Sequence, residues 1–350
     1  MSPSTFQRSP MSRRRLLKNS TLAAAALTLP LSSLRARAAT SVSMTIDWVF
    51  EGSNAGFIIA REMGFYRDAG LDVAVGPGKG SGNTAQLVAA KATQIGFSDG
   101  YTCGNGISKG MAIKTIGSVF RRAPAAIIVL GNSSIKAPKD LEGRTLAMTA
   151  GSGVFQQWSA YVKGAGLDVS KIKIVNIDPS GLGPALIAGK VDAIGGYAAS
   201  YVPSIEILGK KQARLLWLAD AGVNIVSNGI IAHNDLIKSD PDLLHKFVPA
   251  SIKGFLYARQ HIDDAVAVVK KYSPTSDPAI LKSGFEVSWK SWVTPNTKGK
   301  PLGWEADENW ASTIDVLKQY GGVSTPLTTS QLYTNDFVPA GAEYVPPESA

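Results

Sequence analysis

The sequence of 350 residues is poor in the residue types that build covalent crosslinks and metal sites. Its only cysteine is Cys103, which excludes an intramolecular disulfide and is interpreted as a small buried apolar residue. The three histidines, His233, His245 and His261, stand 12 and 16 residues apart, which is not a zinc-site spacing. The sequence therefore predicts no metal site.

Short catalytic motifs give little support for an enzyme. The pattern Gly-x-Ser-x-Gly, which marks the nucleophile of many serine hydrolases, occurs at residues 96–100 and 106–110, but such a match is a hypothesis that only its structural context can confirm. A glycine-rich stretch runs from Gly78 to Thr84, but it lacks the Gly-Lys-Ser/Thr ending of a nucleotide-binding loop, so ATP binding is dismissed. We therefore expect a protein that is not an enzyme and needs no cofactor.

No hydrophobic run reaches the length of about 20 residues that a membrane span takes. Instead, residues 12–18 read Ser-Arg-Arg-Arg-Leu-Leu-Lys, an Ala/Leu-rich run follows from 21 to 34, and residues 36–38 resemble a cleavage site. This order predicts a twin-arginine signal peptide over residues 1–38. Since no cysteine lies near the cleavage point, we expect a soluble periplasmic protein without a lipid anchor.

Positive charge is concentrated in that leader. The chain has a net charge of +9, and residues 1–38 hold seven arginines and lysines and no acid, so the remainder carries +2. The high isoelectric point therefore does not indicate a nucleic-acid-binding surface. The 312 residues left of 350 exceed the usual size of one domain and predict two lobes.

Short apolar strands alternate with helical segments in these 312 residues, which is typical of an α/β protein with mostly parallel sheets. The expected strands cover residues 42–48, 71–75, 93–97, 113–120, 125–130, 146–149, 172–175, 193–195, 215–218 and 225–232. The expected helices cover residues 54–66, 84–92, 151–162, 183–188, 199–208, 242–260, 261–271, 279–289 and 308–320. We expect lobe one to comprise 39–122 and 226–350 and lobe two to comprise 123–225, with two crossing strands near 121–125 and 222–228.

Polar clusters stand at turns between these strands and helices. In lobe one they are Trp48, Glu51 and Asn54, then Lys79, Ser81, Asn83 and Thr84, then Ser98, Asp99 and Tyr101. In lobe two they are Ser152, Gly153 and Tyr197. Because such turns can converge at one edge of a sheet, these thirteen residues are predicted to line a small-molecule pocket.

Several of these residues have a structural interpretation beside the functional one. Trp48 suits stacking on a flat ligand and equally a place in the core. Asn54 suits the N-cap of the helix that follows it. The two glycine-rich turns, at 78–84 and 151–153, can clamp an anionic or carbonyl group with backbone N–H groups or simply begin two capped helices.

Two carboxylates argue against a purely anionic ligand. Glu51 and Asp99 both stand at turns that should border the cleft, and a buried carboxylate needs a cationic or N–H-bearing partner. Lys79 or Arg61 would be an internal partner. If the ligand is the partner, a flat heterocycle with amine or amide groups fits better than a sulfonate.

Five segments together resemble the periplasmic solute-binding proteins that serve importers of sulfonates, nitrate-type anions and thiamin-precursor pyrimidines. They are Gly64-Phe65-Tyr66, Ala69-Gly70-Leu71-Asp72-Val73, the glycine-rich stretch 78–84, and residues 137–144 and 332–337. The resemblance covers nearly all of the chain after the leader. It implies a type II periplasmic-binding-protein fold, in which two α/β lobes close on the ligand as a Venus flytrap, and an ABC permease as partner.

The chain departs from the pyrimidine-binding branch of that family at one motif. The matching stretch there, and in a related pyrimidine synthase, resembles Asp-Trp-x-Pro-Asn-x-x-His, whereas Phe50, Glu51 and Asn54 replace its proline, asparagine and histidine here. The synthase consumes that histidine, so its chemistry is not expected.

Three functions stay open at this point. The first is capture of a small, planar, nitrogen-containing solute resembling a pyrimidine or thiamin precursor. The second is binding of a sulfonate, nitrate or carboxylate by the same class of importer protein. The third, of another class, is an enzyme like the thiamin pyrimidine synthase. In the first two cases we expect a monomer that does not bind nucleic acid.

Overall fold

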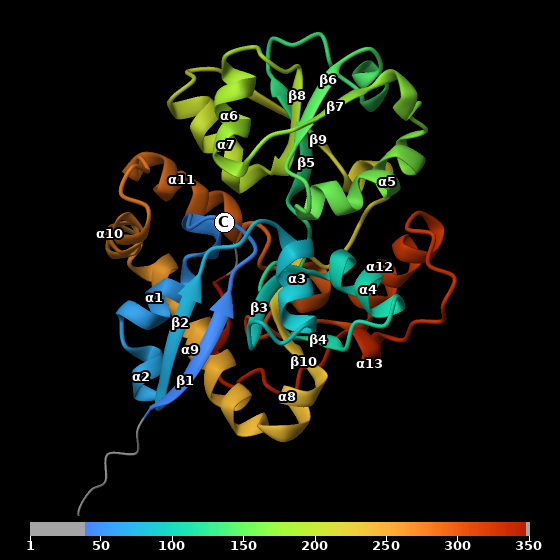
Figure 1. The fold of residues 1–350 in the computed structure, drawn as a ribbon. Helices are drawn as coiled ribbons and strands as arrows, with labels where there is room; N and C mark the ends of the chain where they lie inside the picture. The colour runs from blue at the N-terminus through green and yellow to red at the C-terminus, as the bar shows by residue number, and fades with distance from the viewer. Residues whose placement is uncertain (1–38, 348–350) are drawn as a thin grey trace, which may run out of the picture. The chain divides into compact units, whose positions relative to one another are not determined.

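The computed structural model describes residues 39–347, so the leader predicted over 1–38 lies outside the described residues. Two five-stranded sheets organise the described part of the chain (Figure 1). The first sheet has the order β2-β1-β3-β10-β4, and the second has the order β7-β6-β8-β5-β9.

The first sheet is mixed. Its strands are β1 (Thr40–Thr45), β2 (Leu71–Gly76), β3 (Ile95–Asp99), β4 (Ile113–Ser118) and β10 (Asn228–His233). Strand β1 pairs in parallel with β2 and β3, whereas β10 runs antiparallel to both β3 and β4.

The second sheet repeats this arrangement. Its strands are β5 (Ala125–Leu130), β6 (Thr145–Met148), β7 (Lys173–Asn176), β8 (Ala193–Tyr197) and β9 (Ala213–Trp217). Strand β6 is parallel to β7 and β8, and β5 is antiparallel to β8 and β9. The expectation of mostly parallel sheets is confirmed, since four strands of each sheet run in one direction and a single strand, β10 or β5, runs against them. Each antiparallel strand directly follows a crossing between the sheets, at 119–124 or 218–227, and so enters its sheet from the opposite end.

Helices cover both faces of the first sheet. On one face an apolar core joins the strands to α1 (Gly56–Glu62), α2 (Phe65–Asp68), α9 (Pro241–Gln260), α10 (Ile262–Tyr272) and α11 (Pro278–Trp289). On the other face α3 (Ser81–Ala89) and α4 (Gly100–Ser108) pack on a smaller cluster, which contains the buried Cys103. The short helix α8 (Asn234–Ser239) follows β10 directly.

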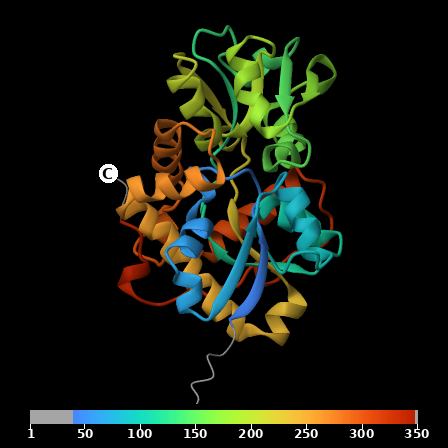
Figure 2. The ribbon, with the colours of Figure 1, turned by 60° about the vertical axis from the view of Figure 1, so that its left-hand side comes forward.

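The second sheet is covered in the same way. One face packs on α5 (Gly153–Ala165), and its apolar core continues into the first lobe, where α12 (Asp307–Gln319) and α13 (Thr329–Leu332) pack against α4. The other face packs on α6 (Pro179–Ile187) and α7 (Ala198–Ile207), and α7 also contacts α11. Figure 2 shows the second sheet and its helices in green and yellow as a unit of its own, which gives the chain two α/β lobes.

Short 3-10 turns complete the described elements: η1 (Gly52–Asn54), η2 (Pro138–Leu141), η3 (Val169–Lys171), η4 (Ala219–Ala221), η5 (Pro295–Thr297) and η6 (Ala342–Tyr344). No helix among residues 39–347 combines the length and the apolar character that a membrane span needs.

Two local differences from the sequence-based expectation affect the site. Helix α4 was not expected, because glycine disfavours helix interiors and three glycines lie within it. It forms because Asp99 caps it and small residues let it pack closely. Strand β1 ends at Thr45, so Asp47 and Trp48 lie in the loop that follows instead of in the strand.

Close approach of α1 and α9 gives a test of the packing of the first lobe. A Cβ atom added at Gly254 would lie 2.0 Å from the carbonyl oxygen of Gly56. Gly254→Ala should therefore lower the free energy of unfolding by about 1–3 kcal/mol, since overpacking forces the two helices apart. Gly76→Ala is the matched control, because its Cβ would lie 3.7 Å from the Met44 carbonyl oxygen, an ordinary van der Waals contact. Equal urea-unfolding midpoints for the two variants would contradict this packing.

Candidate functional site

The loop after β1 is held by the glycine-rich stretch. The backbone N–H of Gly78 donates to the carbonyl oxygen of Trp48 (2.9 Å), and that of Gly80 donates to the carbonyl oxygen of Asp47 (2.7 Å). These bonds fix the turn that carries the Asp47 and Trp48 side chains. They also occupy amides that the sequence analysis assigned to an anionic ligand.

The two glycine-rich turns contact each other directly. Gly82 N–H donates to the carbonyl oxygen of Gly151 at 3.0 Å. Gly80 has a positive φ of 123°, and a Cβ atom there would lie 2.3 Å from the same carbonyl oxygen. The two turns are therefore joined directly, and the expected clamp stays a prediction, since Ser81, Ser152 and Gly153 at the two helix starts line the cavity between the lobes.

A cavity of about 460 Å³, measured to its open mouth, lies where the two lobes face each other. Its lining residues are Asp47, Trp48, Glu51, Ser53, Asn54, Ser81, Phe120, Ser152, Gly153, Val154, Gly195, Gly196, Tyr197, Ser200 and Tyr201. Seven of the thirteen predicted residues are among them: Trp48, Glu51, Asn54, Ser81, Ser152, Gly153 and Tyr197. This figure includes space open to solvent, and the enclosed part is only about 30 Å³, so binding of a small organic molecule requires the lining side chains or the lobes to move apart.

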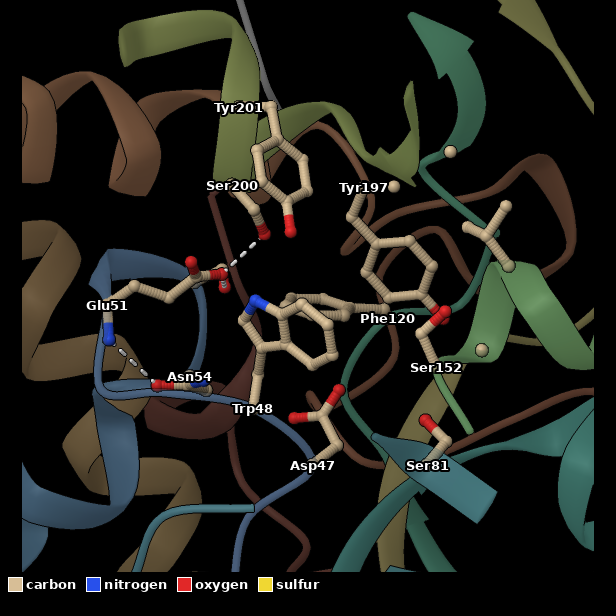
Figure 3. Close-up of a pocket in the computed structure, with 15 residues that line it drawn as sticks. Asp47, Trp48, Glu51, Asn54, Ser81, Phe120, Ser152, Tyr197, Ser200 and Tyr201 are labelled. Atoms are coloured by element: carbon tan, nitrogen blue, oxygen red, sulfur yellow. Dashed lines mark hydrogen bonds between the residues drawn. The ribbon is translucent and has the colours of Figure 1, made fainter. Parts of the chain in front are cut away.

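Four aromatic side chains form much of the wall (Figure 3). Trp48 comes from the loop after β1, Phe120 from the crossing after β4, Tyr197 from the end of β8 and Tyr201 from α7. Trp48 packs against the apolar cluster of the second sheet, so its ring bridges the two lobes. Flat faces on several sides of a small cavity favour a planar ligand.

Glu51 connects the lobes through hydroxyl groups. Its Oε1 accepts hydrogen bonds from Ser53 Oγ in its own turn and from Ser200 Oγ of α7 at 2.7 Å (Figure 3). Burial raises the pKa of Glu51, and the two serine hydroxyls partly oppose that rise. The carboxyl group faces the cavity with neutral partners alone.

Asp47 is the second carboxyl group of the cavity, and its side chain is only 8% exposed. Its Oδ2 accepts a hydrogen bond from Asn228 Nδ2 at 2.7 Å, and Tyr197 OH donates to Asn228 Oδ1 at 2.9 Å. Burial, and then the nearby charge of Glu51, raise the pKa of Asp47 to about 8. Asp47 is therefore mostly protonated at neutral pH in the empty site.

Asp99 lies near this cavity but does not line it, which corrects the prediction. It caps α4, accepting from Thr102 N at 2.8 Å and from Thr102 Oγ1 at 2.6 Å. Gln157 Nε2 of α5 also donates to it, at 3.4 Å. Asp99 is fully buried, and this burial raises its pKa. It is a structural carboxyl group that joins the lobes.

Five further predicted residues also lie outside the cavity lining: Lys79, Asn83, Thr84, Ser98 and Tyr101. Lys79 is exposed and Asn83 is half-buried on α3. Thr84 Oγ1 donates to the carbonyl oxygen of Ile46, and Ser98 Oγ donates to that of Ser81, so both hydroxyls serve the fold. Tyr101 is buried in the core shared by α4 and α12.

Asn54 lines the cavity but is not the predicted helix N-cap, a position that Ala55 occupies. Its Oδ1 accepts from the Glu51 backbone N–H at 3.2 Å, and its Nδ2 donates to the carbonyl oxygen of Val49 at 2.9 Å. The side chain therefore closes the turn that presents Glu51.

Several lining residues were not among the thirteen predicted ones, chiefly Asp47, Phe120, Ser200 and Tyr201. Asp47 and Phe120 were placed in strands, whereas both follow a strand end. The aromatic and polar start of α7, directly after β8, was the available signal for Ser200 and Tyr201.

The raised pKa of Asp47 predicts how stability depends on pH. Between the ordinary aspartate pKa of 3.8 and the value of about 8 in the folded protein, the folded state keeps a proton that the unfolded chain has lost. The free energy of unfolding should therefore fall as pH rises from 4 to 8. Asp47→Asn should make this fall shallower by up to about 1.4 kcal/mol per pH unit.

Urea unfolding at pH 5, 6, 7 and 8 measures this slope. Asp72→Asn, at an exposed carboxyl group on β2, is the control and should leave the slope as it is. The same slope in wild type and Asp47→Asn would show that Asp47 is not a buried, protonated group.

Sequence comparison places this chain among characterised binding proteins. It is 24% identical over 309 residues to the riboflavin-binding protein RibY of Chloroflexus aurantiacus, covering 86% of this chain and 87% of that protein. It is 21% identical over 299 residues to a formylaminopyrimidine-binding protein of Halalkalibacterium halodurans, covering 84% and 90%. One relative is named as an enzyme: 4-amino-5-hydroxymethyl-2-methylpyrimidine phosphate synthase of Legionella pneumophila, 19% identical over 317 residues, covering 89% and 95%.

The fold has a counterpart among solved structures. The alkanesulfonate-binding protein SsuA of Xanthomonas axonopodis pv. citri, bound to MOPS, superposes with a TM-score of 0.64 at 12% identity, covering 84% of this chain and 98% of that one. The two lobes are therefore those of a periplasmic-binding-protein fold. The NMT1/THI5-like family matches residues 52–265, more than half of the chain, and this chain belongs to that family of solute-binding proteins.

Proposed function

We propose that this chain is the periplasmic substrate-binding component of an ABC importer, which captures a small, planar, nitrogen-containing solute and delivers it to a membrane permease. The exported form would be the monomeric part that follows residue 38, with lobe one from 39–122 and 226–350 and lobe two from 123–225. The solute would resemble a pyrimidine in size and flatness.

The make-up of the cavity wall carries this proposal. Two carboxyl groups, Asp47 and Glu51, and four aromatic rings line the cavity, and none of its lining residues is a lysine, arginine or histidine. Carboxyl groups accept hydrogen bonds, so a solute that donates N–H groups fits them. Aromatic faces add stacking to a flat ring.

The same wall disfavours the anionic alternative. A sulfonate, nitrate or carboxylate would meet two acids with no positive side chain in the cavity lining. The amides of Gly78, Gly80 and Gly82, which could have held an anion, already donate to carbonyl groups of the protein. An anion would then depend on the N–H groups of Ser81 and Gly153 at the two helix starts and on the serine hydroxyls of the lining, with no positive side chain beside it.

Binding without catalysis is also the simpler interpretation of the residues present. Asn54 and Glu51 hold each other in the turn, where a consumable histidine would stand in the synthase pattern. Among residues 39–347, no group of three histidine, cysteine or acidic side chains is arranged to hold a metal ion. These features support a binding protein.

Calorimetry on the purified chain without its leader tests the proposal. A panel of aminopyrimidines, other nitrogen heterocycles, aliphatic sulfonates and nitrate should contain a heterocycle that binds with a micromolar or tighter dissociation constant. Absence of binding across the whole panel would refute a binding function for these solutes. Covalent modification of the protein during incubation with iron and pyridoxal phosphate, detected as a mass change, would favour the enzyme instead.

Glu51→Gln separates the two kinds of ligand. It keeps the shape of the side chain but removes its charge, so the bound heterocycle should lose about ten- to a hundredfold in affinity, the value of one charge-assisted hydrogen bond. Glu206→Gln, at an exposed position of α7, is the control and should bind as wild type does. Tighter binding of a sulfonate by Glu51→Gln, with no loss for the heterocycle, would favour the anionic alternative.

A further inference from the structure

We propose that the solute is a cation, a flat ring with an amidinium-like or aminopyridinium-like edge, whose positive N–H groups lie against Asp47 and Glu51 beside the Trp48 ring. This inference rests on the proposed function and narrows it from nitrogen-containing solutes to positively charged ones.

Two buried acids without a positive partner are the first observation. The side-chain partner of Asp47 is the neutral amide of Asn228, and the partners of Glu51 are the hydroxyls of Ser53 and Ser200. No ion pair among the described residues involves either carboxyl group. A buried carboxyl group without a positive partner either keeps a proton, as Asp47 does at neutral pH, or pairs with a cation, and a positive solute would release that proton and pair with both acids.

The internal cations that could have neutralised these acids lie elsewhere. Arg61 and Lys79, the two basic residues nearest in sequence, are both exposed, on α1 and in the glycine-rich stretch. Arg121 is buried, but its guanidinium group donates to the carbonyl oxygens of Thr297 and Pro301. The positive charge that matches the cavity must therefore come from outside the protein.

The aromatic wall is the second observation and is independent of the acids. In Figure 3 the Trp48 ring lies between the carboxyl groups of Glu51 and Asp47, with Tyr197 to one side and Tyr201 beyond Glu51. Aromatic faces carry partial negative charge and attract a desolvated cation. Acids and ring faces thus favour the same sign of charge at the same place.

The two tyrosines of the wall are uncharged, so they add no negative charge beside Asp47 and Glu51. Burial raises the pKa of Tyr197 and of Tyr201 well above the usual tyrosine range, so both hydroxyls stay protonated at physiological pH. Tyr197 OH donates to Asn228 Oδ1 and Tyr201 OH to the carbonyl oxygen of Pro179, so both present uncharged rings to a ligand. The negative charge available to a ligand therefore resides on the two carboxyl groups.

The protonation of Asp47 makes binding of a cation depend on pH. The titratable groups that influence Asp47 are Glu51 in the η1 turn, Asp99 at the start of α4 and Tyr197 at the end of β8. A bound cation favours the ionised form of Asp47, so binding releases a proton below pH 8. Affinity should rise from pH 6 to pH 8, by at most about tenfold per unit, and then level off.

Three probes of one shape and different charge test the inference on the chain without its leader. Benzamidine is a cation across this pH range, benzamide is its neutral counterpart, and benzoate is the anion. Titration calorimetry at pH 8 should show benzamidine binding at least about tenfold more tightly than benzamide, with benzoate not bound. Benzamidine should also bind more tightly at pH 8 than at pH 6.

Two isosteric variants identify the acids responsible. Asp47→Asn should weaken benzamidine binding about tenfold or more and reduce its pH dependence between 6 and 8, while Glu51→Gln should weaken it and move that dependence to lower pH, because the charge of Glu51 helps to raise the pKa of Asp47. Asp72→Asn on β2 is the control that should behave as wild type. The affinity for benzamide should change little in any variant. A variant that loses benzamidine but keeps benzamide has therefore lost the recognition of charge and not the folded site.

The outcomes distinguish this inference from the function beneath it. One contrary result is that benzamide or benzoate binds as tightly as benzamidine, and another is that a neutral heterocycle from the panel binds while benzamidine does not. Either result would overturn the proposal that the solute is a cation and would leave the proposed importer function intact. If neither the probes nor the panel bind, both are overturned. Benzamidine binding that neither acid variant weakens would also overturn the inference.

Discussion

The hydrogen bond from the Asn228 amide to the Asp47 carboxyl group holds the site together. Asp47 follows the first strand of the first sheet, and Asn228 begins β10, where the chain returns to that sheet from the second lobe. Tyr197, at the end of β8 in the second sheet, donates to the same Asn228 side chain. One amide thus connects both lobes and fixes an acid at the edge of the cavity between them.

The contact between the two glycine-rich turns decides what kind of ligand that cavity can take. Helix N-termini often bind anions through their free amides. Here the amides of Gly78, Gly80 and Gly82 donate to Trp48, Asp47 and Gly151, so the protein itself satisfies these three. The side chains that line the cavity are acids, hydroxyls, one amide, one valine and aromatic rings. A shared fold leaves room for this difference, because the solved alkanesulfonate-binding structure agrees in architecture at only 12% identity.

Much of the fold could be predicted because its signals are local. Apolar strands such as Ala125–Leu130 and the alternation of strands with helices are visible in the sequence, and together they indicate two α/β lobes. Strand direction was not visible, since nothing in β5 or β10 records that the chain has just crossed between sheets. Helix α4 was missed because its capping acid and close packing outweigh the low helix propensity of its glycines.

Part of the site could be predicted because some of its residues stand at turns next to strand ends. Trp48, Glu51 and Tyr197 could be found because they stand at turns beside strand ends. Asp99, Thr84 and Ser98 stand at similar turns, yet they serve caps and backbone carbonyls, and only the three-dimensional contacts separate the two groups. Ser200 and Phe120 reach the cavity from the opposite lobe and the crossing segment, which no sequence spacing relates to Glu51.

The proposed preference of the cavity for a nitrogen-bearing aromatic solute over an anion can be tested by native mass spectrometry of the chain without its leader, purified without added ligand. We expect a co-purified small molecule with a single flat nitrogen-containing ring that is lost, or much reduced, in Asp47→Asn. A sulfonate, nitrate or carboxylate retained equally by wild type and Asp47→Asn would contradict this preference.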